Sequence, residues 1–325
     1  MTELTHRVLG ANGIRIHAVE AGRGPLVLLV HGFPESWYSW RHQLPALAAA
    51  GYRAVAIDVR GYGRSSKPAA VDEYRIVKHV GDNVGVVEAL GEQEAVIVGH
   101  DWGAPIASTS CLLRPDVFTA LALLSVPYSP RGGTSPLETF RRMMPPGEEF
   151  YIEYFQQPGR AEAEIEADVR TWLLGFYFSA SGDAPPVTDG RTMASVSAGE
   201  QLRDRLTIPE ALPGWLTEDD LDFYVGEFER TGLTGGLNRY RNMHRDWEDM
   251  AAFSHQPIGV PSLFIGGERD GPTVWGAPAI ARFGETLPAL HGSHILEGCG
   301  HWVQQERAEK VNELLLDFLQ KVRPA

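Results

Sequence analysis

The chain has 325 residues, of which 43% are hydrophobic and 22% are charged, so extended disorder, collagen and coiled coil are excluded. Its 29 Lys and Arg against 42 Asp and Glu give a formal net charge of −13. Binding to nucleic acid or to an anionic membrane depends on clustered Lys and Arg that displace counterions. An acidic chain of this kind is therefore expected to have neither nucleic acid nor a membrane as a partner.

No segment has the pattern of a membrane-spanning or secretory sequence. The aliphatic run at 26–30 is far shorter than the roughly 20 apolar residues that a membrane-spanning helix needs. Residues 1–16 lack the basic start and apolar run of a signal peptide. With only Cys111 and Cys299, a disulfide framework is excluded, and we expect a reducing, cytoplasmic location.

Five short apolar segments have the pattern of strands that are buried on both faces of a sheet. They are residues 26–30, 54–57, 95–98, 120–124 and 262–265. Apolar residues at helical spacing occupy other segments, namely 37–50, 74–90, 102–114 and 305–320. The alternation of strand and helix predicts an α/β fold with a mostly parallel sheet flanked by helices.

The strand pattern disappears in the stretch 128–257, which is rich in aromatic and acidic residues and in helix-like patterns. We interpret this stretch as an inserted helical cap (lid) domain, so that residues 1–127 and 258–325 form the core domain. Within the cap, residues 179–191 combine Ser, Gly, Pro and Asp and are expected to form a mobile loop.

The most informative motif follows the strand at 95–98, where the chain reads Gly-His-Asp-Trp-Gly-Ala and then continues into a helix. Gly99 and Gly103 allow a sharp turn, because a Cβ at either position would clash as the central side chain is raised above the sheet edge. This is a nucleophile-elbow pattern with Asp101 where Ser usually stands. The alternative is that Asp101 only caps the helix N-terminus.

Two later segments favour the interpretation of Asp101 as a nucleophile. Asp270 follows an apolar strand and His301 precedes the last helix, which gives the order nucleophile, acid, base. Loops at the carboxyl ends of parallel strands share one edge of the sheet, so the three side chains can meet there. Glu268, in the same loop as Asp270, is the alternative acid.

The segment 31–40, HGFPESWYSW, directly follows the strand at 26–30. Hydrolase folds supply a backbone N–H from this loop to a developing oxyanion. We expect the N–H groups of Phe33 and Trp102 to form that oxyanion hole, with His31 holding the loop. The alternative is a plain Gly-Pro turn.

These motifs resemble those of the α/β-hydrolase superfamily, and in particular of its soluble epoxide hydrolases. The matching segments are 31–35, 60–66, 99–103 and 300–302, and the resemblance spans nearly the whole chain. It implies an α/β-hydrolase fold with a helical cap, and it suggests a homodimer.

The resemblance extends into the cap, where 151–159 and 237–243 look like the two family segments that present proton-donating tyrosines. It implies this role for Tyr151 and Tyr240. Tyr154 is the alternative for the first of them. Either residue could instead be an aromatic that only packs within the cap.

This set of residues suits displacement at a saturated carbon. Asp101, ionised at neutral pH, would form an alkyl ester whose carbonyl is then attacked by water. His301 would take a proton from that water while Asp270 orients the imidazole ring, and the oxyanion hole would serve this second step. An opened epoxide leaves an alkoxide that the two cap tyrosines can protonate, whereas a halide needs no proton.

The sequence therefore predicts an epoxide hydrolase that opens a small apolar epoxide with water to a vicinal diol. The family resemblance suggests that the enzyme detoxifies epoxides or acts on lipid epoxides. One alternative is a haloalkane or haloacetate dehalogenase that uses the same Asp101, with Trp102 donating to the halide. Another alternative is a non-catalytic receptor that binds a small apolar ligand under the cap.

No cofactor or metal is expected, because the chain lacks His-Glu-x-x-His, Cys-x-x-Cys and Gly-x-x-x-x-Gly-Lys motifs. Gly61-Tyr62-Gly63 also lacks a third glycine at the dinucleotide spacing. Cys299 is expected to be a small buried residue beside the site rather than a redox switch.

Overall fold

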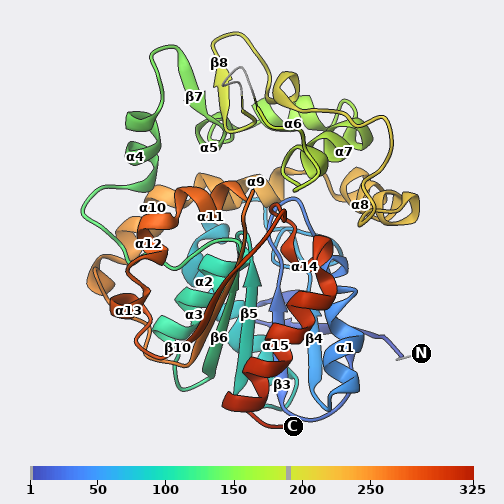
Figure 1. Ribbon diagram of the computed structural model, residues 1–325, viewed down its shortest axis with the longest axis vertical. Coiled ribbons are helices and arrows are strands. Elements are labelled where there is room, and N and C mark those ends of the chain that lie inside the picture. The colour runs from blue at the N-terminus through green and yellow to red at the C-terminus, as the bar shows by residue number, and fades with distance from the viewer. Residues whose placement is uncertain (1–2, 188–191) are drawn as a thin grey trace.

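An eight-stranded sheet forms the centre of the structure, a computed structural model that describes residues 3–187 and 192–325 (Figure 1). Its strands are β1 Thr5–Ala11, β2 Ile14–Ala21, β3 Leu26–Val30, β4 Arg53–Ile57, β5 Ala95–His100, β6 Phe118–Leu124, β9 Ser262–Gly267 and β10 Leu290–Leu296. Their order across the sheet is β1-β2-β4-β3-β5-β6-β9-β10. β2 pairs antiparallel with β1 and with β4, and the other neighbouring pairs are parallel. The predicted α/β fold with a mostly parallel sheet is confirmed.

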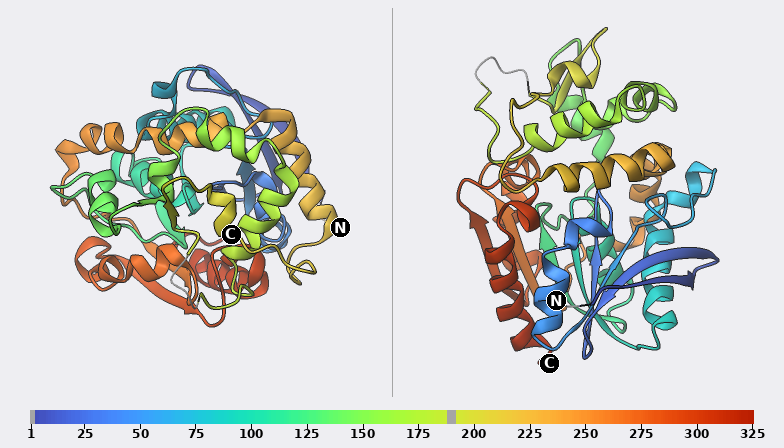
Figure 2. Two further views of the ribbon diagram at one scale, coloured as in Figure 1. Left: turned by 90° about the horizontal axis from the view of Figure 1, so that it is seen from above. Right: turned by 90° about the vertical axis from the view of Figure 1, so that its right-hand side faces the viewer.

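Helices cover both faces of this sheet. They are α1 Gln43–Ala49, α2 Ile76–Ala89, α3 Gly103–Leu113, α11 Gly271–Trp275, α12 Ala277–Ile280, α13 Phe283–Thr286, α14 Val303–Glu306 and α15 Ala308–Val322, with the 3-10 turns η1 Trp37–Trp40 and η2 Val71–Tyr74. Figure 2 shows α15, in red, and the cyan and teal helices α2 and α3 on opposite sides of the strands. Two of the predicted helices are each divided in the structure, the first into η1 and α1 and the last into α14 and α15.

Burial on both faces explains why the central strands are continuous apolar runs. In β3, Leu28 faces the hydrophobic cluster that includes α2 and α3, whereas Leu29 faces the cluster that includes α1 and α15. Both side chains are 0% exposed. The two faces of the sheet thus build two separate cores.

The stretch 128–257, which we call the helical segment, lies over the edge of the sheet where the parallel strands end (Figure 1). It contains α4 Pro136–Met143, β7 Glu148–Phe150, α5 Tyr151–Tyr154, α6 Arg160–Ile165, α7 Val169–Ser179, β8 Ser195–Ser197, η3 Leu202–Arg205, α8 Glu218–Thr231, α9 Thr234–Arg241, α10 Met243–Asp249 and η4 Ala251–Phe253. The strands β7 and β8 were not expected, and at three residues each they are too short to produce a recognisable pattern. Of the loop predicted at 179–191, residues 188–191 lie outside the described residues.

Three further strands of the main sheet, β1, β2 and β10, were not predicted from the sequence. β1 is exposed along most of its length, and in β10 half-buried and exposed residues alternate, so neither is an apolar run. The β1–β2 hairpin did carry a signal, because Asn12 and Gly13 both have positive φ, as an Asn-Gly hairpin turn requires. In the described parts of the chain, no helix has both the length and the apolar character to cross a membrane.

Replacing Leu28 by alanine should lower the free energy of unfolding by about 2–5 kcal/mol, because the cavity would lie in the middle of the sheet. Val8 on β1 is 64% exposed, and Val8→Ala should change that free energy by no more than about 0.5 kcal/mol. Denaturant unfolding monitored by circular dichroism measures both values. Equal effects of the two substitutions would contradict the placement of β3 at the centre of the sheet.

Candidate active site

A sharp turn joins β5 to α3 and carries Asp101 at its tip. Asp101 has a φ of 50°, which is rare for a residue with a side chain. A Cβ on Gly99 would lie 2.1 Å from the carbonyl oxygen of Gly103, and a Cβ on Gly103 would lie 1.9 Å from that of Val30. Only glycine fits at these two positions. The two glycines therefore allow the sharp turn that places the Asp101 carboxylate above the edge of the sheet.

The carboxylate of Asp101 contacts the loop that follows β3. Its Oδ1 accepts a hydrogen bond from the Phe33 backbone N–H at 2.7 Å. Gly32 permits this approach, since a Cβ there would lie 2.2 Å from Oδ1. Trp102 is the N-cap residue of α3, and the helix has no side-chain cap. The alternative in which Asp101 caps the helix is therefore wrong.

His301 lies between two carboxylates. Its Nε2 is 3.5 Å from Oδ2 of Asp101, and its Nδ1 is 2.8 Å from Oδ1 of Asp270. Asp270 is fully buried, and its Oδ2 accepts hydrogen bonds from the hydroxyls of Ser125 at 2.7 Å and Thr273 at 2.6 Å. The alternative acid, Glu268, is exposed and accepts a hydrogen bond from the Gly298 N–H instead. The structure thus brings Asp101, His301 and Asp270 together.

The two carboxylates control the charge of His301. Burial alone would lower its pKa, but the charges of Asp270 and Asp101 and their hydrogen bonds outweigh burial and raise the pKa well above its usual value. The pKa of Asp270 is lowered, because the charge of His301 and the hydrogen bonds of Asp270 outweigh its desolvation. Both contacts therefore favour the imidazolium over the neutral imidazole.

Two tyrosines of the helical segment lie beside the elbow. Burial raises the pKa of both Tyr151 and Tyr240, and the charge of Asp101 raises it further. The two rings are 6.3 Å apart, and Tyr240 packs edge to face on Trp102 at 4.9 Å. A hydrogen bond from the Trp102 indole partly offsets the rise in the pKa of Tyr240.

Tyr154 is engaged elsewhere. Its hydroxyl donates a hydrogen bond to the buried carboxylate of Glu164, which also accepts one from the Trp172 indole. The Arg160 guanidinium lies 3.8 Å from the Tyr154 ring centroid. Of the two tyrosines on α5, Tyr151 is therefore the one within the field of Asp101.

A buried ion pair beneath the site was missed by the sequence analysis. Nδ1 of His100 is 2.7 Å from a carboxylate oxygen of Glu35, and Nε2 is 2.8 Å from the His301 carbonyl oxygen. Because a carbonyl oxygen only accepts, Nε2 of His100 is the donor in the second contact. Burial alone would raise the pKa of Glu35, but His100 outweighs it and lowers the pKa to about 2.

The Glu35 carboxylate also accepts the Gly32 N–H at 3.0 Å, so the ion pair ties the loop after β3 to the loop of His301. Within the loop after β3, His31 accepts the Val59 N–H through Nε2 at 3.0 Å and donates through Nδ1 to the Gly32 carbonyl at 2.8 Å. The adjacency of His100 to Asp101 was the only signal in the sequence for this pair.

Trp102 is fixed from its other side by Arg239, whose guanidinium carbon lies 4.5 Å from the Trp102 ring centroid. Arg239 is buried and forms an ion pair with Asp246, whose carboxylate also accepts the N–H of Ile76. This contact joins the helical segment to the elbow and to the start of α2.

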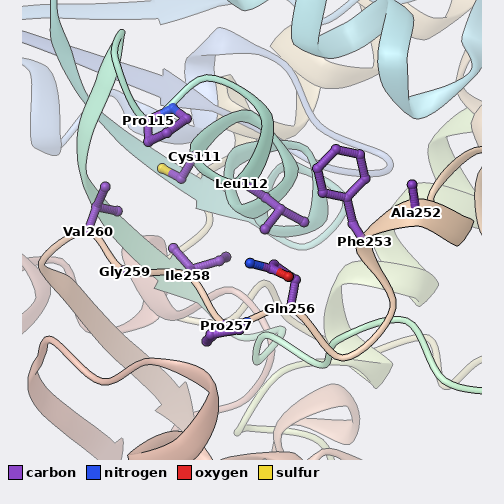
Figure 3. Close-up of a pocket in the computed structure, with 10 residues that line it drawn as sticks. All are labelled: Cys111, Leu112, Pro115, Ala252, Phe253, Gln256, Pro257, Ile258, Gly259 and Val260. Atoms are coloured by element: carbon purple, nitrogen blue, oxygen red, sulfur yellow. The ribbon is translucent and has the colours of Figure 1, made fainter.

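A separate pocket of about 390 Å³ lies between the end of α3 and the stretch 252–260 (Figure 3). Its lining includes Cys111 and Phe253 and none of the residues predicted for the site. Cys111 and Cys299 are free thiols, both buried, and burial raises the pKa of each. In the part of the chain that the structure describes, no cluster of three or more His, Cys, Asp or Glu could hold a metal ion.

Comparison with known proteins identifies the fold described above and assigns the chain to a family. Residues 25–308 match the family described as alpha/beta hydrolase fold. The chain is 45% identical to epoxide hydrolase B of Mycobacterium tuberculosis, over 98% of this chain and 99% of that protein. The solved structure of an epoxide hydrolase from an endophytic Streptomyces is 62% identical, with a TM-score of 0.96 over 98% of this chain and 96% of that one.

A second solved structure, epoxide hydrolase A from Mycobacterium thermoresistibile, is 41% identical with a TM-score of 0.92, over 99% of this chain and all of that one. The fold and the family match thus define the chain as a member of the α/β-hydrolase superfamily. Within that superfamily, similarity over the full length shows that it belongs to the epoxide hydrolase family.

Replacing Asp101 by asparagine should lower the pKa of His301, because the variant removes one of the two charges that stabilise the imidazolium while keeping an acceptor for the Phe33 N–H. Titration of histidine-labelled protein by NMR measures this pKa, and an intact mass confirms the amide. Asp116→Asn, at an exposed residue paired with Arg114, is the control. An unchanged pKa in Asp101→Asn would contradict the electrostatic coupling.

Proposed function

We propose that this chain hydrolyses an epoxide to a vicinal diol through a covalent ester on Asp101. The observation that carries the proposal is the position of two phenols beside the elbow, with Tyr240 packed edge to face on Trp102 and Tyr151 next to Tyr240. The carboxylate at the tip of this elbow faces His301. A nucleophile, two acids and a base thus surround one position at the edge of the sheet.

In the first step, a carboxylate oxygen of Asp101 attacks an epoxide carbon. Oδ1 is held by the Phe33 N–H, so Oδ2 is the oxygen that forms the new bond and Oδ1 becomes the ester carbonyl oxygen. The ring C–O bond breaks, and its electron pair stays on the epoxide oxygen. That oxygen takes a proton from Tyr151 or Tyr240, and positioned acids of this kind contribute typically 10²–10⁴-fold.

In the second step, water attacks the ester carbonyl while His301 removes its proton. The ester has no charge, so His301 loses the attraction of Asp101 and its pKa falls. The proton that leaves His301 goes to the phenolate that the first step formed. Alkylation thus converts His301 into the neutral base that hydrolysis needs. Asp270 keeps the ring in place and stabilises the imidazolium that forms again.

The N–H groups of Phe33 and Trp102 form the oxyanion hole for this step. Phe33 already donates to Oδ1, the atom on which the negative charge develops. The loss of one such donor typically costs about 2.7–4 kcal/mol of transition-state stabilisation. The Glu35 and His100 ion pair holds the loop that positions the Phe33 N–H.

A halide substrate is less well served. A haloalkane needs N–H donors for the leaving halide, and the Trp102 ring is packed edge to face against Tyr240. The two phenols have no function in halide release. These contacts support the epoxide as substrate.

The helical segment 128–257 acts as the cap of this enzyme in our proposal, because it supplies both phenols, and residues 1–127 and 258–325 form the core domain. The substrate is a small apolar epoxide. The reaction serves to detoxify epoxides, including lipid epoxides. We further propose that the enzyme forms a homodimer and is located in the reducing cytoplasm. The two free cysteines support this location.

A panel of epoxides that differ in size and polarity, including a styrene oxide and a lipid epoxide, tests the proposed activity. We expect diol formation from at least one apolar member of the panel and no halide release from a bromoalkane of similar size. Halide release without diol formation would establish a dehalogenase instead. Saturable binding of an epoxide without either product would establish a receptor.

Tyr151→Phe should lower kcat for an epoxide by about 10- to 100-fold, because one of the two proton donors is lost. Tyr154→Phe is the matched control on the same helix, since its hydroxyl is bound to Glu164. This control should keep kcat within about threefold of the native value and lower stability by about 1 kcal/mol. Steady-state diol formation measures kcat, and a larger loss in Tyr154→Phe would reverse the assignment.

A further inference from the structure

Glu306, the last residue of α14, holds the backbone on both sides of His301. Its carboxylate accepts the Gly300 N–H at 2.8 Å and the Trp302 N–H at 3.0 Å. The same carboxylate accepts a third N–H, that of Gly182, at 2.9 Å. Gly182 lies in the helical segment, three residues after the end of α7 and 124 residues before Glu306 in the chain.

The two segments joined by Glu306 also meet backbone to backbone. The His301 N–H donates to the Ala180 carbonyl oxygen at 2.8 Å. A Cβ on Gly300 would lie 2.3 Å from the Gly182 nitrogen, and a Cβ on Gly182 would lie 2.1 Å from the Gly298 carbonyl oxygen. No side chain fits between the two segments, so the His301 loop rests directly on residues 180–182.

Only a carboxylate can accept all three N–H groups. An ionised glutamate presents two acceptor oxygens with about four lone pairs, whereas a glutamine presents one oxygen and an NH₂ donor. In Glu306→Gln the NH₂ group would face at least one backbone N–H and break part of the clamp. The substitution keeps the size of the side chain, so it tests the acceptor pattern rather than the packing.

We propose that Glu306 is a positioning residue for ester hydrolysis, which clamps the His301 loop onto residues 180–182 and so places the base only when the helical segment is docked. The inference rests on the proposed function, because it assigns Glu306 to its second step. In that step the water oxygen bonds to the ester carbon and one water proton passes to His301. The ester C–O bond then breaks, the leaving alkoxide takes that proton from the imidazolium to complete the diol, and the second water proton passes from the Asp101 carboxyl to His301.

The clamp acts selectively on the second step, because His301 is needed as a base only there. Ester formation depends on the carboxylate of Asp101 and on the phenols of Tyr151 and Tyr240, which no hydrogen bond of Glu306 reaches. A loosened His301 loop should therefore slow ester hydrolysis and leave ester formation nearly intact. A residue that only stabilises the fold would not separate the two steps in this way.

The test is a rapid-quench experiment with an epoxide substrate, in which mass spectrometry follows the adduct on the peptide that carries Asp101. In Glu306→Gln we expect ester hydrolysis to slow by about 10- to 100-fold, as for a misplaced catalytic group, and the adduct to accumulate. The rate of ester formation should stay within about threefold of the native rate. His301→Gln serves as the positive control for accumulation.

Two further variants keep the test decisive. Glu309→Gln, at an exposed residue three positions later, should behave as the native enzyme. Gly182→Ala perturbs the clamp from the side of the helical segment and should give the same selective accumulation as Glu306→Gln. Thermal unfolding of each variant separates a loss of folded protein from a loss of rate.

Native rates of both steps in Glu306→Gln, or equal loss of both steps in folded protein, would overturn the inference. These outcomes differ from a failure of the proposed function. If the native enzyme forms diol with no adduct on Asp101 at any time, the covalent route itself is wrong, whatever the variants do.

Discussion

The contact on which the site depends is the one between the Asp101 carboxylate and the loop after β3. It requires a positive φ at Asp101 and three positions without a Cβ, at Gly32, Gly99 and Gly103. Each of these glycines faces backbone or carboxylate atoms that any side chain would displace. The parallel sheet then delivers Asp270 and His301 to the same edge, because the strands before them end there.

One negative charge connects the functional groups of this site. Burial and the charge of Asp101 raise the pKa values of Tyr151 and Tyr240, and the charges of Asp270 and Asp101 raise the pKa of His301 despite its burial. In the proposed mechanism, ester formation removes the charge of Asp101. The event that uses up the nucleophile would therefore also prepare the base.

The residues predicted from the sequence were those whose roles are set by local pattern and sheet topology. Asp101 stands between two glycines in a strand-to-helix turn, and Asp270 follows a recognisable apolar strand. Asp270 was preferred to Glu268 in the same loop. In the structure Asp270 is buried and lies 2.8 Å from Nδ1 of His301, whereas Glu268 is exposed and accepts the Gly298 N–H. The strands β1 and β10 were missed since they are not buried on both faces.

Contacts between distant parts of the chain were not predictable in the same way. Glu35 and His100 are 65 residues apart, and Gly182 and Glu306 are 124 residues apart. Apart from the adjacency of His100 to Asp101, nothing in either local sequence indicates that a buried charge or a carboxylate clamp will form there. Such contacts depend on how the helical segment and the loops pack on the sheet. They fix the distances between the proposed catalytic groups.

Oxygen transfer from solvent to the protein tests the central claim most directly. With enzyme in excess over epoxide in ¹⁸O-labelled water, the first turnover should place one labelled oxygen in the side chain of Asp101, because water attacks the ester carbonyl. The first diol released should then carry unlabelled oxygen from the protein. Label found only in the diol, with none in the peptide that contains Asp101, would show that water attacks the epoxide directly and would contradict the account.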